Sequence, residues 1–148
     1  MWMANAASVI VFPVWILIFF VCFGSYHEVV ITQPETYVVS ALVVLSVPIH
    51  EYLHYLAIRI SAPEIQVRYG IKPPLNPYVA LYGGELSHNK RFVFLLAPFV
   101  IITALCVTGE FLLPQYTLLW IAVASTNASG SITDMARTIK LLKQTIAI

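Results

Sequence analysis

Long apolar runs separated by short polar stretches dominate the pattern of hydrophobic and polar positions along this chain. A helix that crosses a hydrocarbon core of about 30 Å needs roughly 20 residues. Four runs approach or exceed that length, namely residues 7–25, 37–60, 92–113 and 116–139. The pattern therefore predicts one domain over residues 1–148, an α-helical integral membrane protein with about four transmembrane helices.

A different pattern occupies residues 61–91, between the second and third apolar runs. Ile65, Val67, Tyr69 and Ile71 alternate with polar residues or glycine, which is typical of a half-buried strand. After the proline-rich break PPLNP, the stretch YVALYGGEL predicts a second strand that ends at Gly83. We expect a short β-hairpin against the inner membrane leaflet; an amphipathic surface loop without a role is the alternative.

The composition agrees with a membrane protein. Hydrophobic residues make up 59% of the chain and charged residues 10%, whereas about a quarter of a soluble domain is charged. A net charge of +1 gives no reason to expect a nucleic-acid partner. Cys22 and Cys106 lie in apolar runs and are interpreted as buried hydrophobic residues rather than a disulfide. The first run follows no basic region, so we interpret it as a transmembrane helix rather than a signal peptide.

The basic residues predict an orientation. In a four-helix arrangement all eight fall on one side: Arg59, Arg68, Lys72, Lys90, Arg91, Arg137, Lys140 and Lys143. The loops on the other side carry only the acids Glu28, Glu35 and Glu110. Cytoplasmic loops carry the excess of Lys and Arg, so both termini are expected in the cytoplasm.

The second apolar run contains the motif His50-Glu51-x-x-His54. Residues four apart lie on one face of a helix, so His50 and His54 can direct two nitrogens at one Zn²⁺ ion. Glu51 would then serve as the general base toward the attacking water. Each ionisable group at the centre of a membrane helix costs about 2.5–3.5 kcal/mol or more, which marks a functional site. The alternative is a hydrogen-bonded polar seam between helices.

A catalytic zinc site needs a third protein ligand, and the fourth apolar run offers Asp134. His50 lies nine residues before Arg59, about 13 Å along a helix, and Asp134 lies six residues before Lys140, about 9 Å. The two side chains are therefore expected at similar depths. His88 and Glu85, in the cytoplasmic insert, are the alternative ligands.

Asn127 precedes Asp134 by two helical turns and shares its face. Its amide is predicted to contact a developing oxyanion or the substrate backbone, and an ordinary interhelical hydrogen bond is the alternative. The small residues Ser129, Gly130 and Ser131 would allow close helix packing, or a local unwinding that turns Asp134 toward the metal.

These segments carry a resemblance to a known family. HEYLHYL on one helix, a strand-like insert, FLLAPFVI on the next helix and NASGSITDM on the last resemble the putative zincin peptidases, which are similar in layout to the site-2 intramembrane proteases. The resemblance implies zinc held by His50, His54 and Asp134, with Glu51 as the base. It names no substrate.

The sequence thus predicts a zinc-dependent membrane endopeptidase that cleaves a membrane protein or peptide near the cytoplasmic leaflet. A non-catalytic zinc-binding adaptor or regulator is the main alternative, in which Glu51 would have no role. A transporter is disfavoured because the chain has no inverted repeat or pair of broken helices. The sequence indicates no oligomeric state.

Overall fold

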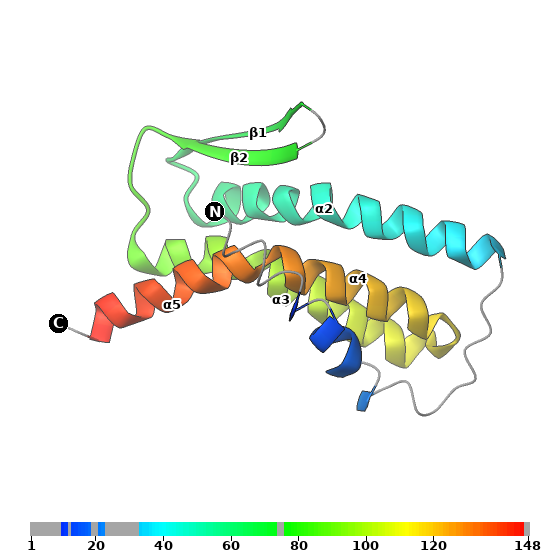
Figure 1. Ribbon diagram of the computed structural model, residues 1–148. Helices are drawn as coiled ribbons and strands as arrows, with labels where there is room; N and C mark the ends of the chain where they lie inside the picture. The colour runs from blue at the N-terminus through cyan, green and yellow to red at the C-terminus, as the bar shows by residue number, and fades with distance from the viewer. Residues whose placement is uncertain (1–9, 12, 19–20, 23–32, 74–75, 147–148) are drawn as a thin grey trace.

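A computed structural model describes residues 10–11, 13–18, 21–22, 33–73 and 76–146 of the chain. Its elements, in order, are α2 (Gln33–Ser61), β1 (Gln66–Lys72), β2 (Asn76–Tyr82), α3 (His88–Leu112), the 3₁₀ turn η2 (Pro114–Tyr116), α4 (Thr117–Gly130) and α5 (Ile132–Ile146). Helices α2, α3 and α4 pack against one another, and α5 continues from α4 past the start of α3 (Figure 1). The described part of the chain is thus mostly helical.

Two helices, over Thr36–Ser61 and His88–Leu112, are long and apolar enough to cross a membrane by length and composition. They contain the second predicted span and all of the third except its last residue, Leu113. Helix α2 begins at Gln33, earlier than predicted, because Pro34 occupies the first turn, where a missing N–H costs no hydrogen bond. Of the first predicted span, residues 7–25, the structure describes residues 10–11, 13–18 and 21–22, all of them helical, and Trp15 and Ile16 pack against the core.

The fourth predicted span is divided. Instead of one helix over residues 116–139, α4 has 14 residues and α5 has 15, with Ser131 between them. Ser131 adopts φ −77° and ψ −5°, and its buried hydroxyl donates to the carbonyl of Asn127 at 2.8 Å. Neither helix alone reaches the roughly 20 residues of a membrane span, so the fourth predicted span is not one continuous transmembrane helix.

The predicted β-hairpin is confirmed. Strands β1 and β2 form a two-stranded antiparallel sheet in which Gln66 pairs with Tyr82 and Lys72 with Asn76. The hairpin lies along the C-terminal half of α2, on the side away from α3 and α4 (Figure 1). Its Tyr69 hydroxyl donates to the carbonyl of Pro48 at 3.3 Å, and the Tyr69 ring packs edge-on against that of Tyr52. The hairpin is therefore attached directly beside the motif.

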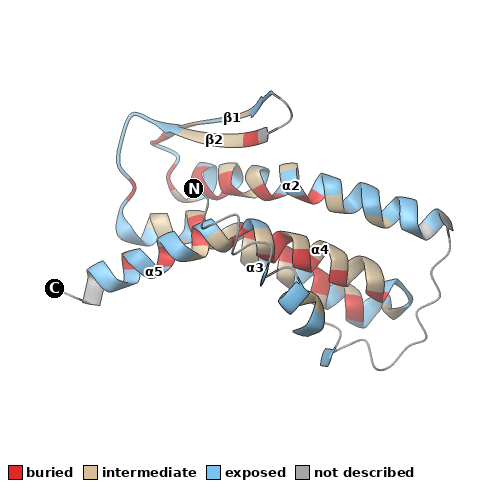
Figure 2. Ribbon diagram, in the orientation of Figure 1, coloured by how far each residue is buried: buried red, intermediate tan, exposed pale blue. Residues whose placement is uncertain are grey.

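Burial is concentrated where the helices face one another (Figure 2). One core cluster joins α3 to α4 and comprises Ile102, Cys106, Ile121 and Ala124. A second joins the end of α2 to the segments flanking the hairpin and comprises Ile58, Ala62, Ile65 and Leu86. Cys22 and Cys106 are both free, and Cys106 is buried as expected, but Cys22 is exposed, so the prediction that it is buried is wrong. The N-terminal half of α2 is also largely exposed.

A close contact fixes the turn from α3 to α4. A Cβ atom placed on Gly109 would lie 2.7 Å from the Trp120 ring, so only glycine allows this approach. The Trp120 indole N–H donates to the carbonyl of Leu113 at 3.1 Å. Helix α3 extends to Leu112, so Glu110 belongs to its last turn and is buried, not part of the loop expected there.

Candidate metal centre

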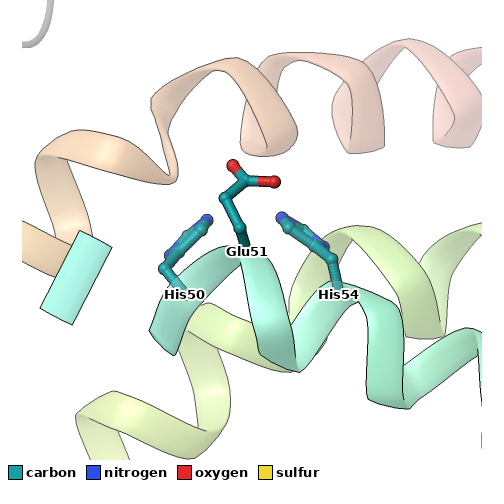
Figure 3. A group of neighbouring side chains, drawn as sticks. All are labelled: His50, Glu51 and His54. Atoms are coloured by element: carbon teal, nitrogen blue, oxygen red, sulfur yellow. The ribbon is translucent and has the colours of Figure 1, made fainter. Parts of the chain in front are cut away.

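The three motif residues lie together on α2. His50 and His54 are buried and Glu51 is half-buried, and one ligand atom from each lies within 4.8 Å of the others. The four-residue spacing places His50 and His54 on one face of the helix. Figure 3 shows the Glu51 carboxylate between the two imidazole rings. These residues could hold a metal ion.

Asp134 approaches the same point from α5. Its Oδ2 atom lies 3.1 Å from Nε2 of His54 and 3.6 Å from Nε2 of His50. The residue is buried and lies in the first turn of α5, where the helix dipole favours a carboxylate. The division between α4 and α5 at Ser131 creates this helix start. The structure thus brings together the three residues that the sequence proposed as ligands.

The outer nitrogen of each histidine has its own partner. Nδ1 of His50 lies 2.9 Å from Oδ1 of Asn127, and Nδ1 of His54 lies 2.6 Å from the carbonyl oxygen of Phe94. Both oxygens only accept hydrogen bonds, so each Nδ1 carries a proton and donates it. In a neutral imidazole the lone pair then lies on Nε2, the atom that faces Asp134.

This donor set fits a zinc ion. Nε2 of His50, Nε2 of His54 and Oδ2 of Asp134 converge in a buried space, with the His54 and Asp134 atoms at hydrogen-bond distance, and either a proton or a metal cation among them would offset the repulsion of their lone pairs. Imidazole nitrogen and carboxylate oxygen are both zinc ligands, and ligating histidines normally donate their other N–H to a carbonyl or carboxylate. His50 and His54 have that arrangement.

A small cavity of about 90 Å³ adjoins the site on the side of His50 and Glu51. Ser46 and Val47 of α2 and Thr126, Asn127 and Gly130 of α4 complete its lining. A cavity of this size admits a few water molecules, because one needs about 10–15 Å³ by this kind of measure. A Cβ atom on Gly130 would meet no atom within 4 Å, so the wall is open there. The cavity thus has room for water beside Glu51.

Asn127 contacts a histidine rather than facing open space. Its carbonyl oxygen accepts from His50, and its amide nitrogen donates to the carbonyl of Phe99 at 3.4 Å. The side chain is buried, at 3% exposure. These contacts orient His50; the predicted contact of Asn127 with an oxyanion or substrate stays a prediction.

The alternative ligands lie elsewhere. Glu85 is exposed and pairs with Arg91 at 3.7 Å, and His88 is an exposed residue at the start of α3. Neither belongs to the described cluster of metal-binding side chains. Glu64 faces solvent just before β1 and pairs with Lys90. His27, the remaining histidine of the chain, lies outside the described residues.

Two contacts were not foreseen from the sequence. His54 contacts the backbone carbonyl of Phe94, and because every residue has a backbone carbonyl, the sequence could not predict this partner. Arg137 lies one turn after Asp134, and its Nη1 atom is 3.6 Å from Oδ1 of Asp134. The spacing of three residues on a helix could have suggested this second pair.

Comparison with known proteins identifies the family. No curated protein and no solved structure matches the chain. Residues 43–146, well over half of the chain, match the family described as putative zincin peptidase. That segment contains the whole cluster, from the motif on α2 to Asp134 on α5. The chain therefore belongs to the putative zincin peptidase family.

Proposed function

We propose that the protein is a zinc-dependent, membrane-embedded endopeptidase that hydrolyses a peptide bond of a membrane protein near the cytoplasmic leaflet. One observation carries this proposal. Nε2 of His50 and Nε2 of His54 both face Oδ2 of Asp134, at 3.6 and 3.1 Å, beside a cavity that includes Glu51. Membership of a zincin family agrees with peptide hydrolysis.

His50, His54 and Asp134 would hold the ion. When zinc is bound, it would lower the pKa of a water molecule and polarise the scissile carbonyl. Glu51, the fourth member of the group, would remain outside the ligand set, with its carboxylate on the wall of the small cavity. There it accepts the proton of the attacking water and delivers it to the leaving amine.

Asn127 and Phe94 would act as positioning groups. By accepting hydrogen bonds from the Nδ1–H groups of His50 and His54, they would favour the tautomer whose Nε2 lone pair points at Asp134. Outer-shell partners of this kind typically change metal affinity by about 10–100-fold.

The membrane placement is supported by exposed apolar surface. Val44 on α2 and Leu105 and Phe111 on α3 are 69%, 63% and 72% exposed, on two helices that are long enough to span. Lipid would cover these side chains. The basic residues at one end of the bundle favour placing the hairpin and both termini in the cytoplasm.

A membrane-spanning substrate is helical, whereas hydrolysis needs an extended backbone. We propose that the hairpin binds an unwound segment of the substrate as an added strand. The sheet has two strands in the described residues, so each strand has an edge without a strand partner. The hydrogen bond from Tyr69 to the carbonyl of Pro48, which precedes His50 by two residues, would hold this sheet beside the metal centre.

Zinc content and turnover test the proposal together. Protein purified in detergent is expected to contain one equivalent of zinc and to cleave quenched-fluorescent apolar peptides, and chelation should stop cleavage. Glu51→Gln should keep the zinc and lose activity by about 100-fold or more, because a general base contributes about that much. Freshly purified protein without zinc would contradict the proposal. Stoichiometric zinc without any turnover in the wild type would favour the non-catalytic adaptor, and unchanged turnover in Glu51→Gln would contradict the role of Glu51 as the base.

A further inference from the structure

A second, larger cavity lies at the same end of the molecule. Its volume is about 490 Å³, and it is lined by the end of β2, the segment that leads into α3, the first turns of α3 and the middle of α5. These segments lie near one another where the chain descends from the hairpin to α3 beside α5 (Figure 1). Neither His50 nor Glu51 lines it, so it is separate from the small catalytic cavity.

Three cations surround this cavity, namely Arg91 of α3 and Arg137 and Lys140 of α5. The one acid in its lining, Glu85, has a 92% exposed side chain and lies 3.7 Å from Arg91. Among the described residues, Lys140 has no carboxylate partner within 4 Å. The cavity therefore carries net positive charge.

The remaining lining is largely apolar. Leu86 and Leu95 are buried, and Phe94, Leu81 and Leu141 adjoin them. Cations around an apolar floor match a molecule with an anionic head and a hydrocarbon tail. An acidic peptide would instead need cations spread along a groove as long as a strand. A phosphate group suits arginine, which can bind two of its oxygens at once.

We propose that this cavity binds an anionic membrane phospholipid, with its phosphate among Arg91, Arg137 and Lys140 and part of an acyl chain against Leu86 and Leu95. The inference rests on the proposed membrane placement but not on zinc or on proteolysis. Basic pockets at the cytoplasmic end of membrane helices are suited to such head groups. Arg137 connects this site to the metal centre, because it lines the cavity and also contacts Asp134.

The experiment uses the full chain in a neutral detergent, so that no charged surface attracts lipid diffusely. Native mass spectrometry would follow binding of dioleoylphosphatidylglycerol, dioleoylphosphatidylcholine and glycerol phosphate. The wild type is expected to retain one phosphatidylglycerol, to bind phosphatidylcholine at least about tenfold more weakly, and to keep its lipid in the presence of glycerol phosphate.

Two lysines of α5 provide matched variants. Lys140→Glu should weaken phosphatidylglycerol binding by roughly 25-fold, since each charge near a head group is worth about fivefold and the reversal changes two. Lys143→Glu, three residues further on the same helix and outside the cavity, should change it by less than about twofold. Arg91→Gln should weaken binding by about fivefold and serves as a second cavity variant.

Several outcomes would overturn the inference. An equal loss in the two lysine variants would mean diffuse attraction, and equal binding of phosphatidylcholine would mean an apolar groove without head-group recognition. Displacement by glycerol phosphate would indicate a phosphate site alone, and displacement by a soluble acidic peptide would indicate a peptide site. His50→Ala should lose zinc and still bind the lipid, so failure here is distinguishable from failure of the proposed metal centre.

Discussion

Two buried carboxylates, Asp134 and Glu110, have very different surroundings. Asp134 is 8% exposed and faces two histidines and Arg137. Glu110 is 5% exposed; its Oε1 accepts from the Thr117 hydroxyl at 2.8 Å, and its Oε2 has no hydrogen-bond partner in the described part of the chain. Burial alone therefore does not mark a functional carboxylate. The difference is that nitrogen atoms of His50, His54 and Arg137 converge on Asp134, whereas Glu110 contacts a hydroxyl.

The Glu110 contact has a structural interpretation. It joins the last turn of α3 to the first residue of α4, next to the close packing of Gly109 against Trp120. The same Thr117 hydroxyl lies 2.7 Å from the carbonyl oxygen of Pro114. The contacts at this end of the bundle hold the α3–α4 turn in place, whereas His50, His54 and Asp134 gather farther along the bundle.

The largest expected effect is a difference in zinc affinity between variants of Asp134 and variants of Glu110. Asp134→Asn removes the anionic ligand and should lower zinc affinity by more than about 100-fold, beyond the range of outer-shell changes. Glu110→Gln, an equally conservative change at a buried acid, should leave zinc stoichiometric. Competition with a metal chelator measures both variants, and equal zinc loss in the two would remove the distinction.

The next effect concerns the partner of His50. Asn127→Ala should lower zinc affinity by about 10–100-fold, because the Nδ1 proton loses its acceptor. Asn127→Asp restores an acceptor and should recover zinc binding. Thr126→Ala is the matched control: it lines the same cavity, but its hydroxyl donates to Ala122 of its own helix. A similar loss in Thr126→Ala would show that the cavity wall, not the histidine contact, controls affinity.

A smaller effect is expected at the α3–α4 turn, where a substitution should change the free energy of unfolding but not zinc binding. Thr117→Val leaves Oε1 of buried Glu110 without its hydroxyl donor, at a cost of about 1–3 kcal/mol in the free energy of unfolding. Zinc content should not change. Thermal unfolding in detergent measures the cost against Thr108→Val, an exposed position on α3. Metal loss in Thr117→Val would contradict the assignment of this end to structure.

The smallest effect concerns an exposed carboxylate, Glu64, and depends on pH. The hydrogen bond from Lys90 lowers the pKa of the Glu64 carboxyl below its ordinary value. A lowered folded-state pKa contributes stability above the unfolded-state pKa, and that stability is lost as the pH falls through the folded-state value. Glu64→Gln should therefore flatten the acid limb of a plot of Tm against pH slightly. An unchanged acid limb would mean that solvent and salt screen the pair completely.

The local pattern predicted much of this protein. Alternation from Ile65 to Ile71 predicted β1, and the apolar runs predicted the bodies of α2 and α3. Within the site, the four-residue spacing of His50 and His54 required only helical geometry to bring them together. Asp134 was found by comparing depths along two helices, and the structure does bring it to both histidines.

Other features depended on contacts between elements far apart in the chain. The division at Ser131, the burial of Glu110 and the Phe94 carbonyl beside His54 each depend on how helices cross. A backbone carbonyl has no residue-type signature, and small residues allow a helix to continue as readily as to bend. Asn127 illustrates the same limit, because its position on the face of Asp134 was evident but its contact with His50 was not.

The sequence by itself determined the apolar helices, the hairpin and the motif, because helical and strand periodicity act over a few residues. The tertiary structure decided which atoms of His50, His54, Asn127 and Asp134 face one another. It also gathered Arg91, Arg137 and Lys140 around one apolar cavity. Those arrangements come from the packing of α2, α3 and α5, which local periodicity constrains but does not specify.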